Sequence, residues 1–202
     1  GATATVEFTL LNYAAKVTDK DGNELEGSPY KTFADAITVA QGSEGSTVTL
    51  LDDVTLTKQQ VISSGKLTLD LNGKNLINEN GRVLYIYEEA DLTIKDSGEG
   101  GTIETKYEYV DCIENSGKLT VESGIIKGDG GIRNYGVLYF NDGTVEADFY
   151  AAITNYSSGT VYVYNGVLKG GKNPAAVDNN GTLYIYDGEI KGITNSNTVY
   201  IS

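Results

Sequence analysis

The sequence predicts an all-β fold, a single-stranded parallel β-helix of about seven coils with a short N-terminal capping helix and hairpin. Three observations lead to this prediction. Short strand-like segments recur between residues 47 and 202, apolar and polar residues alternate within them, and Gly, Asn or Asp separates them. Segments this short, without Asn-Gly turns between equal arms, do not form hairpins, so each repeat is expected to form one solenoid turn.

Four eight-residue segments align without gaps and define the repeat. They begin at Gly117, Gly136, Gly159 and Gly181, and a truncated fifth copy begins at Asn197, so the copies start 16 to 23 residues apart. A second strand-like segment follows each copy and a third precedes it. Each repeat therefore holds three short strands, and we expect equivalent strands to stack in parallel ~4.8 Å apart.

The alignment also predicts which side chains face the core, because alternate residues of a strand point to opposite sides. Burying each inward side chain is worth ~1.5–3 kcal/mol before entropy. We expect residues 47–202 to form one continuous domain around these columns. The expected columns are Leu119, Leu138, Val161, Leu183 and Val199; Val121, Phe140, Val163, Ile185 and Ile201; Ile126, Val145, Leu168 and Ile190; and Ile113, Ile132, Ile153, Val177 and Ile193.

Residues 1–46 differ from the repeats and are expected to form a strand or hairpin and the capping helix. Residues 17–25 are typical of a hairpin over Asp21-Gly22. Thr32 is a suitable helix N-cap, and an apolar helix face over the open end of the solenoid would cover its core. That face consists of Phe33, Ala36, Ile37 and Ala40.

The C-terminal end carries no cap, because the last copy stops within a repeat at Ser202. We expect a longer chain or another subunit to cover this coil. The open coil is therefore a candidate surface for self-association.

Composition excludes several classes of function. The net charge of −13 disfavours nucleic acid and anionic membranes as partners, and no apolar run is long enough to insert into a membrane. The chain has no His and one Cys, which removes His-based triads, His metal sites and Cys-cluster zinc sites. We expect neither a metal nor a cofactor.

The repeat Ala-Ile-x-Asn-x-Gly-x-Leu-x-Ile-x-x-Gly-x-Ile-x-Gly resembles right-handed parallel β-helix domains of the pectin-lyase-like superfamily, over residues 30 to 202. The segments 30–37, 47–54 and 69–74 resemble a subset found in large surface or adhesin-like proteins of anaerobic bacteria. The resemblance implies a right-handed coil and an extracellular or cell-surface location, with any signal peptide outside this sequence. It does not decide the activity, since the superfamily includes lyases, hydrolases, phage tailspikes and non-catalytic adhesins.

An asparagine recurs at one turn position of each repeat. We expect these amides to form an internal ladder in which each side chain bonds its neighbour in the next coil. The predicted ladder consists of Asn115, Asn134, Asn155, Asn179 and Asn195.

Outward tyrosines form two columns on the repeated strands. Strand propensity and stacking between coils account for them on structural grounds. The functional alternative is a flat aromatic surface on which sugars stack or a protein docks. The predicted ligand-binding residues are Tyr139, Tyr162, Tyr184 and Tyr200 in one column and Tyr164 and Tyr186 in the other.

The ionisable residues favour no particular catalytic site. Asp52 and Asp53 are adjacent and would point to opposite faces of a strand, whereas an acid–base pair needs carboxylates that face each other. Arg82 and Arg133 are the only arginines, and the Arg-rich motif of pectate lyases is missing. We interpret Arg133 as a salt-bridged surface charge and Cys112 as a small core residue.

The expected function is therefore a non-catalytic, adhesin-like module that binds a polysaccharide or a host surface glycoprotein through the tyrosines. One alternative is a polysaccharide lyase or glycoside hydrolase of the pectin-lyase-like superfamily. Another is a structural spacer in a larger surface protein. The three differ in whether products form from uronic-acid polymers and whether the tyrosines tolerate substitution.

Overall fold

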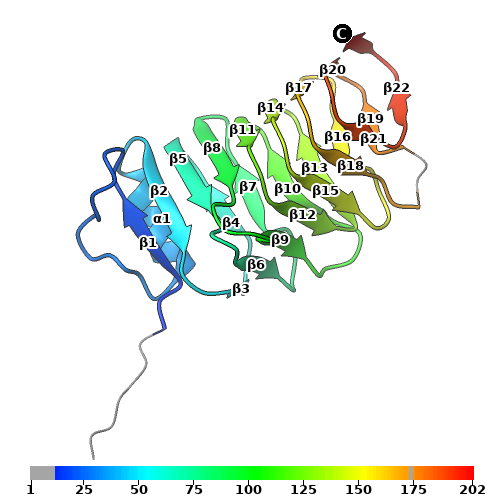
Figure 1. Cartoon of the computed structure of the whole chain (residues 1–202). Coiled ribbons are helices and arrows are strands. Elements are labelled where there is room, and N and C mark those ends of the chain that lie inside the picture. Colours follow the sequence, from blue (N-terminus) through cyan, green and yellow to red (C-terminus); the bar gives the residue numbers. More distant parts are fainter. Residues whose placement is uncertain (1–11, 173–174) are drawn as a thin grey trace, which may run out of the picture.

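A computed structural model describes residues 12–172 and 175–202, which form a parallel β-solenoid of stacked coils with one helix (Figure 1). Three sheets run along the stack. Sheet A consists of β1 (Ala15–Thr18), β2 (Ser46–Leu50), β5 (Gly65–Asp70), β8 (Ala90–Lys95), β11 (Lys118–Val121), β14 (Val137–Phe140), β17 (Thr160–Val163), β20 (Thr182–Ile185) and β23 (Thr198–Ile201).

The other two sheets contain seven strands each. Sheet B consists of β3 (Val54–Leu56), β6 (Asn75–Asn78), β9 (Thr102–Thr105), β12 (Ile125–Gly128), β15 (Thr144–Ala147), β18 (Val167–Lys169) and β21 (Glu189–Ile190). Sheet C consists of β4 (Gln60–Ile62), β7 (Leu84–Ile86), β10 (Asp111–Asn115), β13 (Gly130–Asn134), β16 (Ile153–Asn155), β19 (Val177–Asn179) and β22 (Ile193–Asn195).

Each coil takes one strand from each sheet, in the order A, B, C, and β23 begins a further coil. The winding is right-handed, as parallel β crossovers generally are. Every strand pair within the solenoid is parallel, and only β1 pairs antiparallel, with β2. The parallel β-helix and its single helix confirm the fold that the repeats predict.

The core lies between the three sheets, where the expected inward columns stack in register. Leu119 pairs with Leu138, which pairs with Val161, and all three side chains are fully buried. The register follows from the alternation within the strands, because a slip of one residue would turn these side chains outward. The repeat alignment therefore predicts the core of the earlier coils correctly. In the last strands, β21 to β23, the predicted residues Ile190 and Val199 are only partly buried and Ile193 and Ile201 are exposed, because no further coil packs against them among the described residues.

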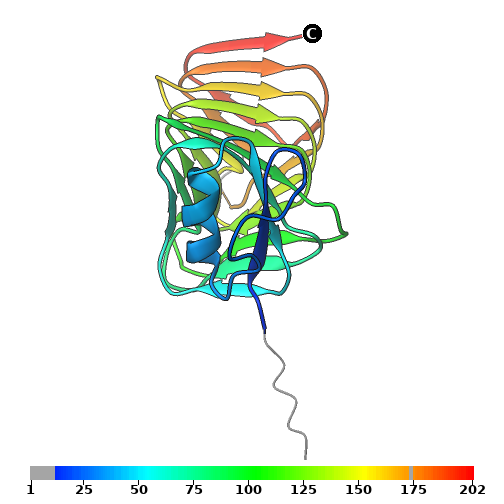
Figure 2. The same cartoon turned by 90° about the vertical axis from the view of Figure 1, so that its left-hand side faces the viewer.

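The N-terminal end of the core is covered by α1 (Phe33–Gln41), which lies across the end of the stack in Figure 2. The hydroxyl of Thr32 accepts a hydrogen bond from the backbone N–H of Asp35 at 3.1 Å, as an N-cap does. The apolar face expected at Phe33, Ala36, Ile37 and Ala40 is buried. The described helix is too short to cross a membrane.

The segment before the helix turns back, but it does not form a regular hairpin. The N–H of Leu25 donates to the carbonyl of Val17 at 2.9 Å, and a single bridge joins Thr18 to Glu24. The strand β1 instead finds its full partner in β2. The edge of sheet A offers β1 a longer row of hydrogen-bonding groups than residues 23–25 do.

The last coil has no covering element among the described residues. Ile201 is 74% exposed and Ile193 is 36% exposed, although both occupy columns that are buried in earlier coils. Ile193 on β22 and Ile201 on β23 therefore expose apolar side chains at the end of the stack that carries the C-terminus, which Figure 1 marks.

Candidate functional site

The tyrosines expected to bind ligand lie on the outer face of sheet A, in two stacked rows that we call the tyrosine face. In the long row, ring centroids from Tyr139 through Tyr162 and Tyr184 to Tyr200 are 4.9, 4.8 and 4.7 Å apart, and the planes diverge by at most 10°. The six residues are Tyr139, Tyr162, Tyr184, Tyr200, Tyr164 and Tyr186.

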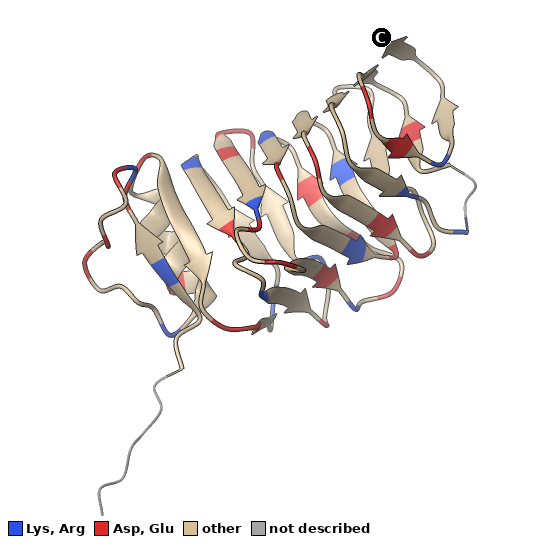
Figure 3. Ribbon diagram, viewed as in Figure 1, with Lys and Arg blue, Asp and Glu red and all other residues tan. Residues whose placement is uncertain are grey.

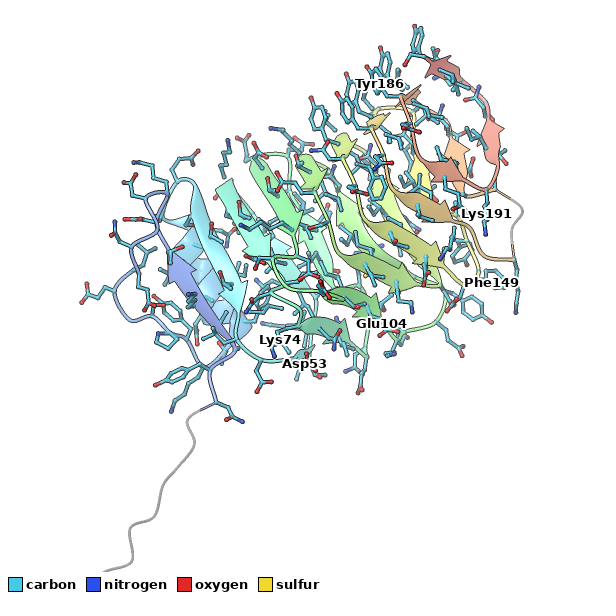
Figure 4. The ribbon with its side chains drawn as sticks, viewed as in Figure 1. Asp53, Lys74, Glu104, Phe149, Tyr186 and Lys191 are labelled. Carbon is cyan, nitrogen blue, oxygen red and sulfur yellow. The ribbon has the colours of Figure 1, made fainter. Side chains whose placement is uncertain are left out.

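The short row stands beside the long one, at the ends of β17 and β20. The rings of Tyr164 and Tyr186 are 4.8 Å apart and inclined by 3°, and the Tyr164 ring lies 6.5 Å from that of Tyr162. Tyr164 and Tyr186 are 41% and 45% exposed, and Figure 4 shows Tyr186 pointing away from the solenoid. The structure thus brings the six predicted tyrosines together.

Stacking determines which part of each ring a partner can reach. Tyr162 has a tyrosine ring on each of its two faces, so only its edge and hydroxyl are available. Partial burial and the neighbouring tyrosines raise the pKa of Tyr162 above its ordinary value, so its hydroxyl remains a hydrogen-bond donor. The middle of the long row, at Tyr162 and Tyr184, therefore presents ring edges and phenol groups rather than open ring faces.

The asparagines lie at the ends of the sheet C strands and form one hydrogen-bonded row. From Asn115 onward, each side-chain Nδ2 donates to Oδ1 of the next asparagine, with N–O distances of 2.8, 2.9, 2.7 and 2.8 Å. Each Nδ2 also donates to a backbone carbonyl in the turn towards sheet A, as Asn155 does to Gly159 at 3.2 Å. The row joins successive coils, and it consists of Asn115, Asn134, Asn155, Asn179 and Asn195.

The asparagine row begins at Asn115, because the preceding coil has no asparagine at this position. Ile86 occupies the equivalent position in the coil before Asn115, and the Oδ1 atom of Asn115 has no hydrogen-bond partner. Apart from this one buried oxygen, the side-chain polar groups of the buried asparagines are satisfied by the neighbouring coils and turns, so the row is structural.

Acidic and basic side chains alternate on the outer face of sheet B (Figure 3). Glu104, Lys127, Glu146 and Lys169 are in register on successive strands. Glu146 lies 2.7 Å from the Lys169 amine and 3.4 Å from that of Lys127, and these contacts lower the pKa of its carboxyl group. The column pairs its charges with one another and shows no facing pair of free carboxylates.

The adjacent aspartates singled out by the sequence lie near the N-terminal cap. Asp52 and Asp53 line a pocket of about 480 Å³ beside the start of α1. Asp53 accepts hydrogen bonds from the backbone and the side-chain amide of Asn75, and Asp52 accepts one from the N–H of Asp53. Both carboxylates thus support the turn between β2 and β3.

Arg133 forms a salt bridge, as the sequence predicts, but its carboxylate partner is buried rather than on the surface. Its Nε lies 2.7 Å from Oδ2 of Asp111, and the Asp111 side chain is only 4% exposed. Together with Tyr109, Tyr150 and Tyr156, the pair lines a pocket of about 450 Å³ on the outer face of sheet C. The other arginine, Arg82, pairs with Glu114 at 2.9 Å.

Sequence reasoning missed this pocket because its walls come from loops of unequal length. The repeat alignment places Arg133, Thr154 and Asp178 at one outward position, and that column does form the floor. Tyr109 and Tyr150 lie in loops between sheets B and C that have no aligned counterpart. A row of polar residues on one outward column was the observation that could have indicated the pocket.

The remaining candidates indicate no catalytic chemistry. Cys112 is fully buried, which raises the pKa of its thiol well above the ordinary range, and its Sγ contacts the carbonyl of Ile103. Within residues 12–172 and 175–202, no group of three His, Cys, Asp or Glu side chains has a geometry suited to a metal ion.

No protein-family model, curated protein or solved structure matches this chain.

Proposed function

We propose that this chain is a non-catalytic binding module of an extracellular or cell-surface protein, and that its tyrosine face binds glycans. The observation that carries the proposal is the set of six outward tyrosines held in two parallel rows on sheet A. Tyrosine combines an apolar body with a polar tip and is common at recognition surfaces. The resemblance of the repeat to pectin-lyase-like, adhesin-like modules supports the same setting.

The stacking geometry favours recognition through the phenol groups. Because successive rings cover each other, a sugar cannot lie flat on Tyr162 or Tyr184 in the middle of the long row, whereas hydroxyls repeat along that row as the rings do, every 4.7 to 4.9 Å. Such a row suits an extended chain with hydroxyl groups along its length. The net charge of −13 favours a neutral glycan over a polyanionic one.

Affinity electrophoresis through neutral and acidic polysaccharides tests the proposal with two double variants. Tyr162→Phe/Tyr184→Phe keeps the rings and removes the two central hydroxyls of the long row, and Tyr162→Thr/Tyr184→Thr removes both rings and phenol groups while keeping strand propensity. We expect a neutral polymer to retard the unmodified protein and both variants to lose most of that retardation. The matched control is Tyr85→Phe/Tyr87→Phe on sheet C, which should be retarded normally.

A structural spacer is the second candidate, and the ring stacking itself favours it, because rings that satisfy one another need no ligand. A spacer would show no retardation by any polymer and would tolerate the Thr variants. Incubating the same protein with uronic-acid polymers tests the lyase or hydrolase alternative, since either activity would release new products.

A further inference from the structure

We propose that the pocket on sheet C is a separate binding site for one neutral sugar residue, which lies on the outward column of Arg133, Thr154 and Asp178 beside Tyr156. The site lies on a different sheet from the tyrosine face and does not rest on the function proposed for that face. Its volume of about 450 Å³ is in the range of pockets that enclose small ligands.

The floor of the pocket presents polar groups in a fixed order. Arg133, Thr154, Asp178 and Thr194 follow one another on successive strands of sheet C, each facing outward in register. This row offers a guanidinium, two hydroxyls and a carboxylate, which together can donate to and accept from the hydroxyl groups of a sugar.

Asp111 positions the guanidinium at the edge of this floor. Its carboxylate is almost completely buried, and Gly130 on the next strand leaves the space for it, since a Cβ atom there would collide with Oδ1 of Asp111. Nε of Arg133 lies 2.7 Å from Oδ2 of Asp111, and both atoms are buried, so neither contacts a ligand directly. The pair fixes the Arg133 side chain, which is 35% exposed, so that its outer N–H groups can donate to a sugar hydroxyl.

Tyr156 adds an aromatic side chain to the lining of the pocket. Tyr135 stacks on it with centroids 4.4 Å apart, and the Arg133 guanidinium lies 5.9 Å from its centroid. A tyrosine offers both an apolar surface and a hydroxyl beside the polar floor, and a sugar can contact both.

The opposite wall is held in place by other aromatic side chains. The Tyr109 ring packs edge-on against Phe149 at 5.4 Å, and Phe149 packs against Tyr150 at 5.0 Å. Tyr109 adopts a φ of 61°, which is uncommon for a residue with a side chain, and its N–H donates to the Asp129 carboxylate at 2.7 Å. The wall is therefore positioned before any ligand arrives.

The charges on the pocket select a neutral ligand. Asp111 and Asp178 supply two carboxylates, and Arg133 supplies the single cation among the lining residues. An anionic sugar would be repelled by this balance and by the net charge of the chain. A neutral pyranoside meets the aromatic walls and the polar floor without that cost.

Saturation-transfer NMR with methyl glycosides tests the site. The probes are the neutral methyl glycosides of glucose, galactose, mannose and xylose, with methyl galacturonoside and methyl glucuronoside as charged counterparts. We expect transfer to at least one neutral glycoside and a titration of backbone amide shifts that maps to β13 and β16. Two variants, Tyr156→Leu and Asp111→Asn, should each weaken binding at least tenfold.

Two controls separate this site from the tyrosine face and from loss of folding. Tyr162→Phe/Tyr184→Phe should bind the glycoside normally. Tyr156→Leu loses a stacked ring and should melt at a somewhat lower temperature, but its circular dichroism spectrum at the temperature of the binding measurement should match that of the unmodified protein. The proposal is overturned if no neutral glycoside shows transfer, if both pocket variants bind unchanged, or if a uronoside binds more tightly than every neutral probe. If no polymer retards the unmodified protein but a neutral glycoside still binds, only the function proposed for the tyrosine face is refuted.

Discussion

At the scale of single residues, Asn155 shows how one side chain can link three coils. It is fully buried, accepts a hydrogen bond from Asn134 at 2.9 Å and donates to Asn179 at 2.7 Å. Replacing Asn155 with Ala would leave polar groups of both neighbours unpaired, which costs ~1–3 kcal/mol. We expect the melting temperature to fall by about 2–4 °C for each kcal/mol lost, as measured by circular dichroism.

Asn195 provides the matched control for that substitution. It occupies the last position of the same row but is exposed to water, which can replace its partners. Asn195→Ala should therefore lower the melting temperature much less than Asn155→Ala does. Equal effects of the two changes would mean that the row contributes little beyond the turn in which each asparagine lies.

Glu146 makes stability depend on pH. Hydrogen bonding to Lys169 lowers the carboxyl pKa below its ordinary value of 4.5, so the folded state favours the ionised form. This contribution is present above the unfolded pKa and is lost as the pH falls through the lower folded pKa. We expect urea denaturation midpoints to decrease below about pH 4.5, and Glu146→Gln to make the decrease shallower.

The effect should be small, because water screens both lysine partners. Glu89→Gln, at an exposed turn position, is the control and should leave the pH profile unchanged. A Glu146→Gln profile that matches that of the unmodified protein at every pH would show that the charge column on sheet B adds nothing to stability.

At the scale of the element, the corner between sheets A and B depends on a glycine. Gly143 has a φ of +105°, and a Cβ atom there would lie 2.7 Å from the carbonyl oxygen of Gly124 in the preceding coil. Gly143→Ala should therefore cost about 1–3 kcal/mol, measured by chemical denaturation. Gly100→Ala is the control, because Gly100 also has a positive φ but faces open space. It measures the cost of the backbone conformation alone, without the collision with the neighbouring coil.

The elements themselves differ in how far the sequence predicts them. The strand columns and α1 are predictable because their periods of two and 3.6 residues repeat without gaps. The sheet C pocket is not predictable in this way, since Tyr109 and Tyr150 come from loops of different lengths and Asp111 has no aligned carboxylate in the next coils. Alignment also placed the tyrosines in columns but could not show that their faces cover one another.

At the scale of the whole molecule, each coil contacts mainly its two neighbours, so stability should vary along the stack. The first coil is covered by α1, whereas the strands of the last coil, β21 and β22, are largely exposed. The two ends of the described stack therefore have similar strands, but only the first is covered by a helix. Comparing their stabilities shows how much that cover contributes.

Hydrogen exchange followed by mass spectrometry measures that difference. We expect amides of β2 to exchange slowly with those of the central coils, and amides of β21 to β23 to exchange orders of magnitude faster, because local opening there exposes little additional apolar surface. Protection of the last coil that equals that of the first would contradict this expectation. Protection that disappears on dilution would instead show that the apolar end around Ile193 and Ile201 is covered by a second copy of the chain.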